Sequence, residues 1–318
     1  MQGKIQFTAL IACAMLILPA AAFADNTSGP GNNTPKVNPQ YLQAALASAT
    51  CQVSLTTGYL QSVINLNQTT FASLNQDVTK LNGDLTTLQG YVSNNDVKGF
   101  QSFVQGQFKT DTRSANLDTQ NLIKTAHLTK DQRATLKSEM SQLQSKNKSC
   151  MFAARQQSAN VKVQNYQNQI THMQNRSKTL SDKGIDTTAL NNQISGASGQ
   201  VSSLQNAINS ANDSKSLQKA INSFCLYDGC KKGTNFHFAA NSAIVVKQAQ
   251  LTKIQSRNGS STYGTQITQA QSDLNAAQSV LNTVGNGQYS GTQQSTVWND
   301  IKAATDIINQ LWHELNHK

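Results

Sequence analysis

The chain has 318 residues, of which 37% are apolar and only 13% are charged, and its formal net charge at pH 7 is +10. An ordinary globular protein carries about twice that share of charged residues; here glutamine, asparagine, serine and threonine replace them. The four prolines are too few for a collagen-like or proline-rich disordered chain. No apolar run beyond the N-terminus reaches the roughly 18–20 residues that a membrane helix needs.

Residues 1–24 have the pattern of a secretory signal peptide. Lys4 supplies the positive charge, residues 5–22 are apolar, and Ala22-Phe23-Ala24 is a small-x-small cleavage pattern. The alternative is an uncleaved anchor, which the short apolar stretch disfavours. We therefore expect a secreted or extracytoplasmic protein, in the periplasm or at the cell surface, cleaved near Ala24. Residues 25–39 are rich in Gly, Asn, Thr and Pro and predict a disordered leader.

Four cysteines remain after cleavage, an even number that suggests two disulfides in an exported chain. Cys225 and Cys230 are predicted to pair, because the Asp228-Gly229 sequence between them can turn the chain. Cys51 and Cys150 then pair by elimination. The alternative of a zinc site is weak, since the chain has no CxxC spacing.

The strongest pattern in the chain is a heptad repeat of apolar residues. Within residues 40–94, apolar residues occupy a and d positions of the repeat from Leu46 to Val92. From Leu60 onward they recur alternately every four and three residues, with Asn67 the only polar residue among them. This spacing is typical of a coiled coil. It predicts one helix of about 75 Å over some 50 residues.

Further helices are predicted along the rest of the chain, and no segment has the pattern of a strand. Thr129 and Gln132 predict a capping box at the start of a long helix, and Gly184 predicts a turn between two helices. The expected helices cover 97–126, 130–180, 190–211, 214–224, 237–256, 267–284 and 297–315.

The predicted fold is therefore all-α, an elongated arrangement of antiparallel helical hairpins or a coiled-coil bundle. We expect one domain over residues 40–230 and a C-terminal hairpin region over residues 231–318. Three straight helices running up, down and up would place Cys51 about 45 Å from the level of Cys150. Either a helix bends, the order differs, or the predicted disulfide pairing is wrong.

One local motif suggests metal chemistry. His313, Glu314 and His317 match H-E-x-x-H, in which two histidines bind zinc and the glutamate is the general base. The motif ends one residue before the last residue of the sequence, which leaves no room for a downstream third ligand, so we interpret it as a chance match. No nucleophile elbow, P-loop or dinucleotide-binding fingerprint is present. We expect no enzymatic activity, no cofactor and no catalytic residues.

The positive charge points to anionic partners. The basic residues are spread along the sequence with few aromatic residues, which does not favour nucleic acid. An exported basic protein meets anionic polymers of the cell envelope, such as teichoic acid or acidic polysaccharide, or lipid head groups. Protein clients are the other expected class of partner. Short predicted turns favour helices that pair within one chain, so we expect a monomer or a weak oligomer.

Leu128-Thr129-Lys130-Asp131-Gln132 resembles the LTxxQ motif of the Spy/CpxP family of exported helical proteins, and the motif recurs at Leu251–Gln255. The resemblance implies a chaperone or stress sensor outside the cytoplasm. We expect a non-enzymatic structural or interaction protein of the secreted or envelope-associated class. The alternatives are a Spy-like holdase, and a helical pore-forming toxin component that inserts through Phe236–Ala240 and Ala243–Val246.

Overall fold

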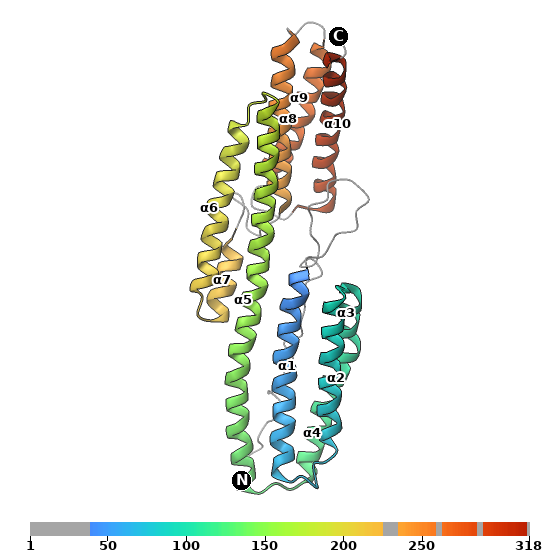
Figure 1. The fold of residues 1–318 in the computed structure, drawn as a ribbon, viewed down its shortest axis with the longest axis vertical. Coiled ribbons are helices and arrows are strands. Elements are labelled where there is room, and N and C mark those ends of the chain that lie inside the picture. The colour runs from blue at the N-terminus through green and yellow to red at the C-terminus, as the bar shows by residue number, and fades with distance from the viewer. Residues whose placement is uncertain (1–38, 225–234, 259–262, 285–288, 317–318) are drawn as a thin grey trace. The chain divides into compact units, whose positions relative to one another are not determined.

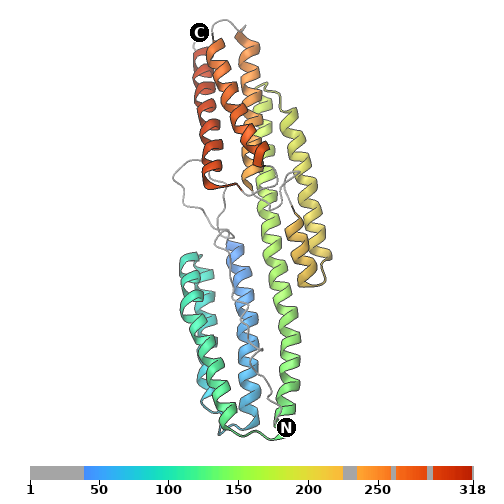
Figure 2. The ribbon, with the colours of Figure 1, turned by 180° about the vertical axis from the view of Figure 1, so that it is seen from behind.

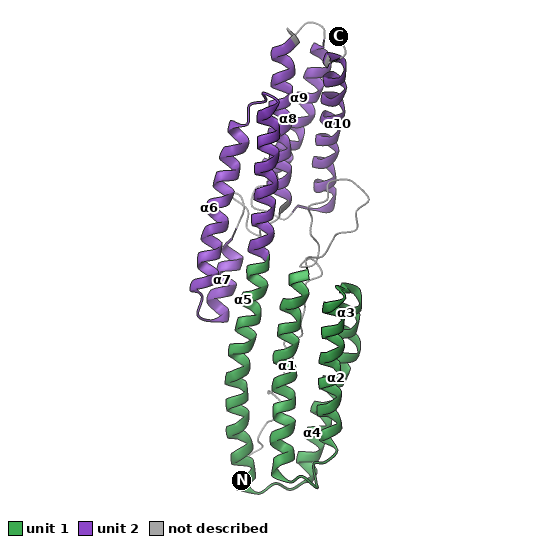
Figure 3. Cartoon of the chain, in the orientation of Figure 1, with its two compact units in different colours: residues 1–161 green, residues 162–318 purple. Residues whose placement is uncertain are grey.

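The computed structural model describes residues 39–224, 235–258, 263–284 and 289–316, and within these ranges the chain forms helices and no strand. The predicted all-α fold class is confirmed. The chain divides into two compact units, residues 1–161 and residues 162–318 (Figure 3). The predicted domain boundary at residue 230 lies outside the described residues and stays a prediction, as do the signal peptide and almost all of the leader.

Unit 1 is built from four helical segments and the first part of a long fifth helix. In the opposite views of Figures 1 and 2, α1 (Pro39–Leu66) lies between α5 (Lys130–Asp182) and the group of α2, α3 and α4. That group comprises α2 (Leu74–Ser93), α3 (Val97–Phe103), the π-helical turn η3 (Val104–Phe108) and α4 (Lys109–Thr125).

The prediction of one helix over residues 40–94 was wrong. The helix ends at Leu66, and the backbone carbonyl of Asn67 accepts a hydrogen bond from Phe71 N at 3.0 Å while its side-chain oxygen accepts one from Thr70 N at 3.0 Å. Asn and Thr side chains compete in this way for backbone groups and weaken a helix. The single polar residue in the heptad pattern therefore marks the break, and the repeat on either side belongs to two helices that pack on each other.

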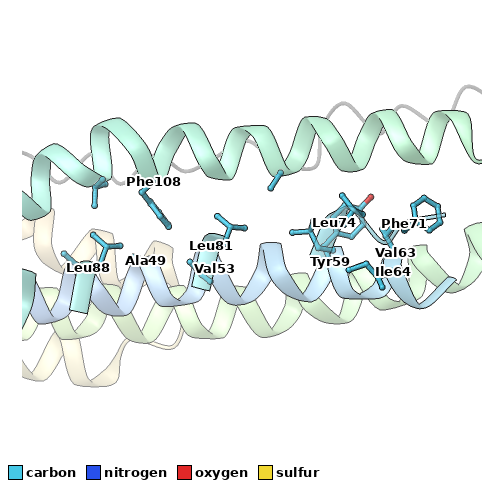
Figure 4. Packing of buried hydrophobic residues seen from close by; sticks show 14 of the residues in the cluster. Ala49, Val53, Tyr59, Val63, Ile64, Phe71, Leu74, Leu81, Leu88 and Phe108 are labelled. Atoms are coloured by element: carbon cyan, nitrogen blue, oxygen red, sulfur yellow. The ribbon is translucent and has the colours of Figure 1, made fainter. Parts of the chain in front are cut away.

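The core of unit 1 fills the space between these helices. Figure 4 shows side chains such as Val53 of α1, Leu81 of α2 and Phe108 of η3 in this core. Phe71, in the break itself, is fully buried and anchors the turn to the same core. Burying each such side chain contributes roughly 1.5–3 kcal/mol.

Unit 2 contains residues 162–182 of α5, followed by α6 (Thr188–Ser210), α7 (Ser214–Ser223), α8 (Asn235–Asn258), α9 (Gly264–Val284) and α10 (Gly291–Asn316). Helices α8, α9 and α10 pack on one another around a continuous apolar core (Figure 1). The predicted helices of this half are confirmed within one to three residues at most ends.

The predicted helix ends are formed by the residues expected. Thr129 Oγ1 accepts a hydrogen bond from Gln132 N, and Gln132 Oε1 accepts one from Thr129 N, which is the predicted capping box. Gly184 has a φ of 68°, a left-handed conformation that favours glycine, and it ends α5. Asp186 then accepts a hydrogen bond from Thr188 N at 2.8 Å at the start of α6.

Glutamine side chains form hydrogen bonds along the helices at the spacing where other proteins use ion pairs. The amide of a glutamine donates to an asparagine or acidic side chain four residues later, at 2.7–3.3 Å. Such pairs contribute about 0.2–0.5 kcal/mol each. They occur at Gln61–Asn65, Gln107–Asp111, Gln205–Asn209, Gln218–Asn222, Gln269–Asp273, Gln271–Asn275, Gln278–Asn282 and Gln310–Glu314.

Candidate functional site

The helices α1 and α5 of unit 1 are joined by a disulfide between Cys51 and Cys150, with their Cα atoms 5.7 Å apart. This is the pairing that elimination predicted from the sequence. The distance conflict disappears because α1 ends at Leu66 and α5 starts at Lys130, so that the two helices run in opposite directions from neighbouring ends.

Two further contacts set the register of α1 and α5. Gln132 Nε2 donates to the carbonyl oxygen of Leu66 at 3.4 Å, near the ends where the helices meet. A Cβ on Gly58 would lie 2.8 Å from Leu143 Cδ2, so the leucine side chain packs directly on the glycine. The disulfide follows seven residues further along each helix, which is two helical turns from the Gly58–Leu143 contact.

This register fixes which face of α5 is turned toward α1. Leu136, Ala154 and Val161 are almost fully buried, and Leu143 lies on the same side of the helix. The disulfide and the glycine contact therefore hold α5 in one rotation about its own axis.

A second face of α5, about a third of a turn away, carries only basic charge. Lys130, Arg133, Lys137, Lys148 and Arg155 all fall within an arc of about 60° at 3.6 residues per turn. All five side chains are exposed. None of them forms an ion pair within the part of the chain that the structure describes. We call these five residues the basic face.

The charge of unit 1 is segregated between its helices. Residues 39–125, which form α1 to α4, contain five basic and five acidic residues and are neutral overall. Residues 130–161 of α5 contain six basic and only two acidic residues. The two acids, Asp131 and Glu139, lie outside the arc of the basic face. The whole net positive charge of this part of unit 1 is therefore on α5.

The seven-residue spacing of the basic face continues to Lys162 in unit 2, but the side chain there is no longer exposed. Lys162 follows Arg155 by seven residues, and burial lowers the pKa of its ammonium group. Because Lys162 is partly buried while the five residues before it are exposed, the basic face ends at Arg155.

Unit 1 also holds carboxylates inside its helical bundle. Lys80 Nζ lies 2.7 Å from Asp111 Oδ1, and the Asp111 side chain is almost fully buried. Asp84 is 5% exposed, and one of its carboxylate oxygens has no hydrogen-bond partner among the described residues. Burial first, and then the charge of Asp111 and a hydrogen bond with it, raise the pKa of Asp84 to about 6, while the charge of Lys80 opposes this.

A histidine and a tyrosine form a buried pair in unit 2. The hydroxyl of Tyr289 donates to the carbonyl oxygen of Leu281 at 3.1 Å, and it lies 2.6 Å from His237 Nδ1. Burial lowers the pKa of His237, which keeps the ring neutral. Tyr289 thus provides a hydrogen bond to a backbone carbonyl in the last turn of α9, which would otherwise lack a partner within the helix. The pair therefore stabilises the helix end.

The structure gives the H-E-x-x-H residues no shared site among the described residues. His313 is exposed, Glu314 Oε1 accepts a hydrogen bond from Gln310 Nε2 at 3.0 Å, and His317 lies outside the described residues. No group of three His, Cys, Asp or Glu residues in the described ranges has the geometry to hold a metal ion. The predicted pair Cys225–Cys230 also lies outside the described residues.

The two segments considered for membrane insertion contribute to the core of unit 2. Phe238, Ala240, Ile244 and Val246 are at most 2% exposed within α8. Within the described ranges, none of the helices combines the length and the apolar character needed to cross a membrane.

Exposed apolar surface is scarce in both units. Among the described residues, Leu117 is the only large hydrophobic side chain that is classed as exposed, at 48%. A holdase needs a broad apolar surface to shield its clients, and patches of a few hundred Å² mark such surfaces. Exposed positions among the described residues instead carry mostly polar or charged side chains.

The two LTxxQ matches differ in their structural setting. Thr129 and Gln132 form the capping box at the start of α5. The second match lies within the C-terminal third of α8, where Leu251 and Ile254 are buried and Thr252 Oγ1 donates to the carbonyl of Gln248. The first match caps the start of a helix, whereas the second lies inside a helix and caps nothing.

The basic face was not predicted, because the basic residues look dispersed when the whole chain is considered at once. The signal that identifies it is the seven-residue interval from Lys130 to Lys137 and from Lys148 to Arg155, read on the predicted helix over 130–180. Comparisons with protein-family models, curated proteins and solved structures found no match to this chain.

Proposed function

We propose that the protein is a non-enzymatic helical interaction protein, secreted or attached to the cell envelope, which binds an anionic polymer of that envelope. The observation that carries the proposal is the segregation of charge in unit 1, where α1 to α4 are neutral and the exposed surface of α5 is basic. Within unit 1 the excess positive charge lies on this one helix, which a general need for solubility does not explain.

Three features support a role outside the cytoplasm. The N-terminal sequence matches a cleavable signal peptide, and disulfides persist in oxidising compartments. The Cys51–Cys150 bond joins residues 99 positions apart, so it constrains a large part of unit 1. Within the described ranges the helices use glutamine-donated side-chain hydrogen bonds and a single ion pair, so few of their contacts depend on external salt.

The proposal is tested with the mature chain purified with its disulfide intact. We expect it to co-sediment with isolated cell envelopes of the source organism at low salt and to be released at high salt. Binding that is absent at all salt concentrations would contradict the proposal.

Two further assays separate the other functional classes. Suppression of aggregation of an unfolded client at equimolar ratio, without envelope binding, would replace the proposal by the Spy-like holdase. Dye leakage from liposomes would replace it by the pore-forming class. The scarcity of exposed apolar side chains and the burial of Phe238 and Ile244 weigh against both of these outcomes.

A further inference from the structure

We propose that the basic face of α5 is the binding site, and that its ligand is a linear polyanion that lies along the helix axis. This inference rests on the proposed function and adds to it the residues and the shape of the ligand. The face comprises Lys130, Arg133, Lys137, Lys148 and Arg155.

The spacing of the five cations favours a polymer over a small anion. From Lys130 to Arg155 the helix rises about 38 Å, and Lys137 and Lys148 are separated by about 16 Å along the axis. A single phosphate or carboxylate can reach at most neighbouring members of the row. Only a chain with repeated negative charges can contact all five cations.

The surroundings of the face distinguish the class of polyanion. Single-stranded nucleic acid is held by exposed aromatic side chains that stack on bases. The only aromatic residue between Lys130 and Arg155 is Phe152, which is half-buried. A bilayer surface is bound by a helix that also presents exposed apolar residues, and this stretch of α5 exposes no large hydrophobic side chain. The chemistry that fits is a flexible polymer with phosphodiester or carboxylate groups and no bases.

The attachment of α5 to α1 prepares the face for binding. The disulfide and the Gly58–Leu143 contact hold the buried side of α5 toward α1, so the basic side remains turned to solvent. A helix that is already formed and fixed in rotation loses little entropy on binding, which increases affinity.

Binding is measured with two base-free probes, poly(glycerol phosphate) and polygalacturonate, by titration at several salt concentrations. The test variant carries Lys137→Gln, Lys148→Gln and Arg155→Gln. The control carries Lys98→Gln, Lys109→Gln and Lys146→Gln, which removes the same charge from exposed positions outside the basic face.

We expect the test variant to bind at least 10-fold more weakly than the wild type at physiological salt, and the control to remain within about 3-fold. Each lost contact with a flexible polyanion reduces the slope of log K against log salt by about 0.7, so the test variant should lose about 2 units. Equal losses in both variants would show that net charge alone acts, and would overturn the inference while the proposed function stands.

A measurement without substitutions gives an independent check. Acetylation of the wild-type protein should be slowed by bound polymer at Lys137 and Lys148, and unchanged at Lys146 on the other side of α5. Protection that is equal at all three lysines would overturn the inference.

The choice of probe identifies the source of the ligand. Tighter binding of poly(glycerol phosphate) points to a teichoic-acid-type polymer, and tighter binding of polygalacturonate to an acidic polysaccharide. Both support the site. Single-stranded DNA or anionic vesicles that bind 10-fold more tightly than both probes would contradict the proposed ligand class. No binding of either probe by the wild type would overturn the site even if the protein is retained by envelopes.

Discussion

At Gly58, the absence of a side chain allows α5 to pack closely on α1, although glycine weakens a helix. A Cβ at this position would lie 2.8 Å from Leu143 Cδ2, whereas a Cβ on Gly83 of α2 would meet nothing within 4 Å. Replacing glycine by alanine in an open helix position gains about 1 kcal/mol. The two glycines have the same helical setting and differ in their neighbours.

We therefore expect Gly83→Ala to raise the free energy of unfolding by about 0.5–1 kcal/mol, and Gly58→Ala to give no gain or a loss. Urea unfolding of both variants measures the difference. An equal gain in the two variants would show that Leu143 moves aside without cost and that the contact does not set the register.

The second residue-scale prediction concerns Asp84, whose pKa is raised to about 6 in the folded protein from an ordinary value of 3.8. A carboxyl with a raised folded pKa holds a proton that the unfolded chain has already lost. Its stabilising contribution is therefore full below pH 4 and is lost as pH rises through 6. The neighbouring charged groups Asp111, which raises the pKa, and Lys80, which lowers it, modulate this change.

Asp84→Asn removes that titration and should raise the free energy of unfolding at pH 7.5 by about 1–3 kcal/mol. The gain should disappear at pH 4, where Asp84 is protonated in the wild type. Urea unfolding of the wild type and of the variant at pH 7.5 and at pH 4 measures this difference in the free energy of unfolding. A gain that is the same at both values would mean that the pKa of Asp84 is not raised.

At the scale of the helices, the disulfide is the covalent link between α5 and the rest of unit 1. The bond closes a loop across 99 residues, for which the chain-entropy model gives about 4–5 kcal/mol. We expect the Cys51→Ser, Cys150→Ser double variant to lose about 3–5 kcal/mol in the free energy of unfolding of unit 1. Reduction of the wild type should lower stability by a similar amount, and a loss below about 1 kcal/mol would show that the helices hold together without the bond.

Helix positions were predictable where the signal is local, and helix partners were not. The capping residues Thr129 and Gln132 and the turn at Gly184 specify helix ends through bonds to nearby backbone groups, and the structure has them as expected. The break at Asn67 was missed because the heptad spacing continues across it. The same apolar spacing fits one long helix and two shorter helices that fold back on each other. Which of the two forms depends on packing between helices, which the spacing does not contain.

The candidate site was predictable in its chemistry and not in its location. The composition contains an excess of positive charge, from which we expect an anionic partner, and that partner stays a prediction. The exposed basic face is recognised only once the bounds of α5 are known and once its buried side is known. The contacts at Gly58 and Cys51 define that buried side. The pairing of Cys51 with Cys150 was predicted, although the helix order assumed at that point did not allow it.

For the molecule as a whole, folding and binding should respond differently to salt. Lys80–Asp111 is the one ion pair between described residues, and these residues are held mainly by apolar cores and glutamine-donated hydrogen bonds. Surface ion pairs weaken with salt, but the described part of the chain has few to lose. Binding through the basic face depends on released counterions and should be strongly salt-dependent.

The measurement that tests the central claim most directly is the salt dependence of wild-type binding to poly(glycerol phosphate), made beside thermal unfolding at the same salt concentrations. Five contacts of the basic face predict a slope of log K against log salt of about −3 to −4, with a melting temperature that changes little. A slope flatter than about −1, or the absence of binding at low salt, would contradict the account.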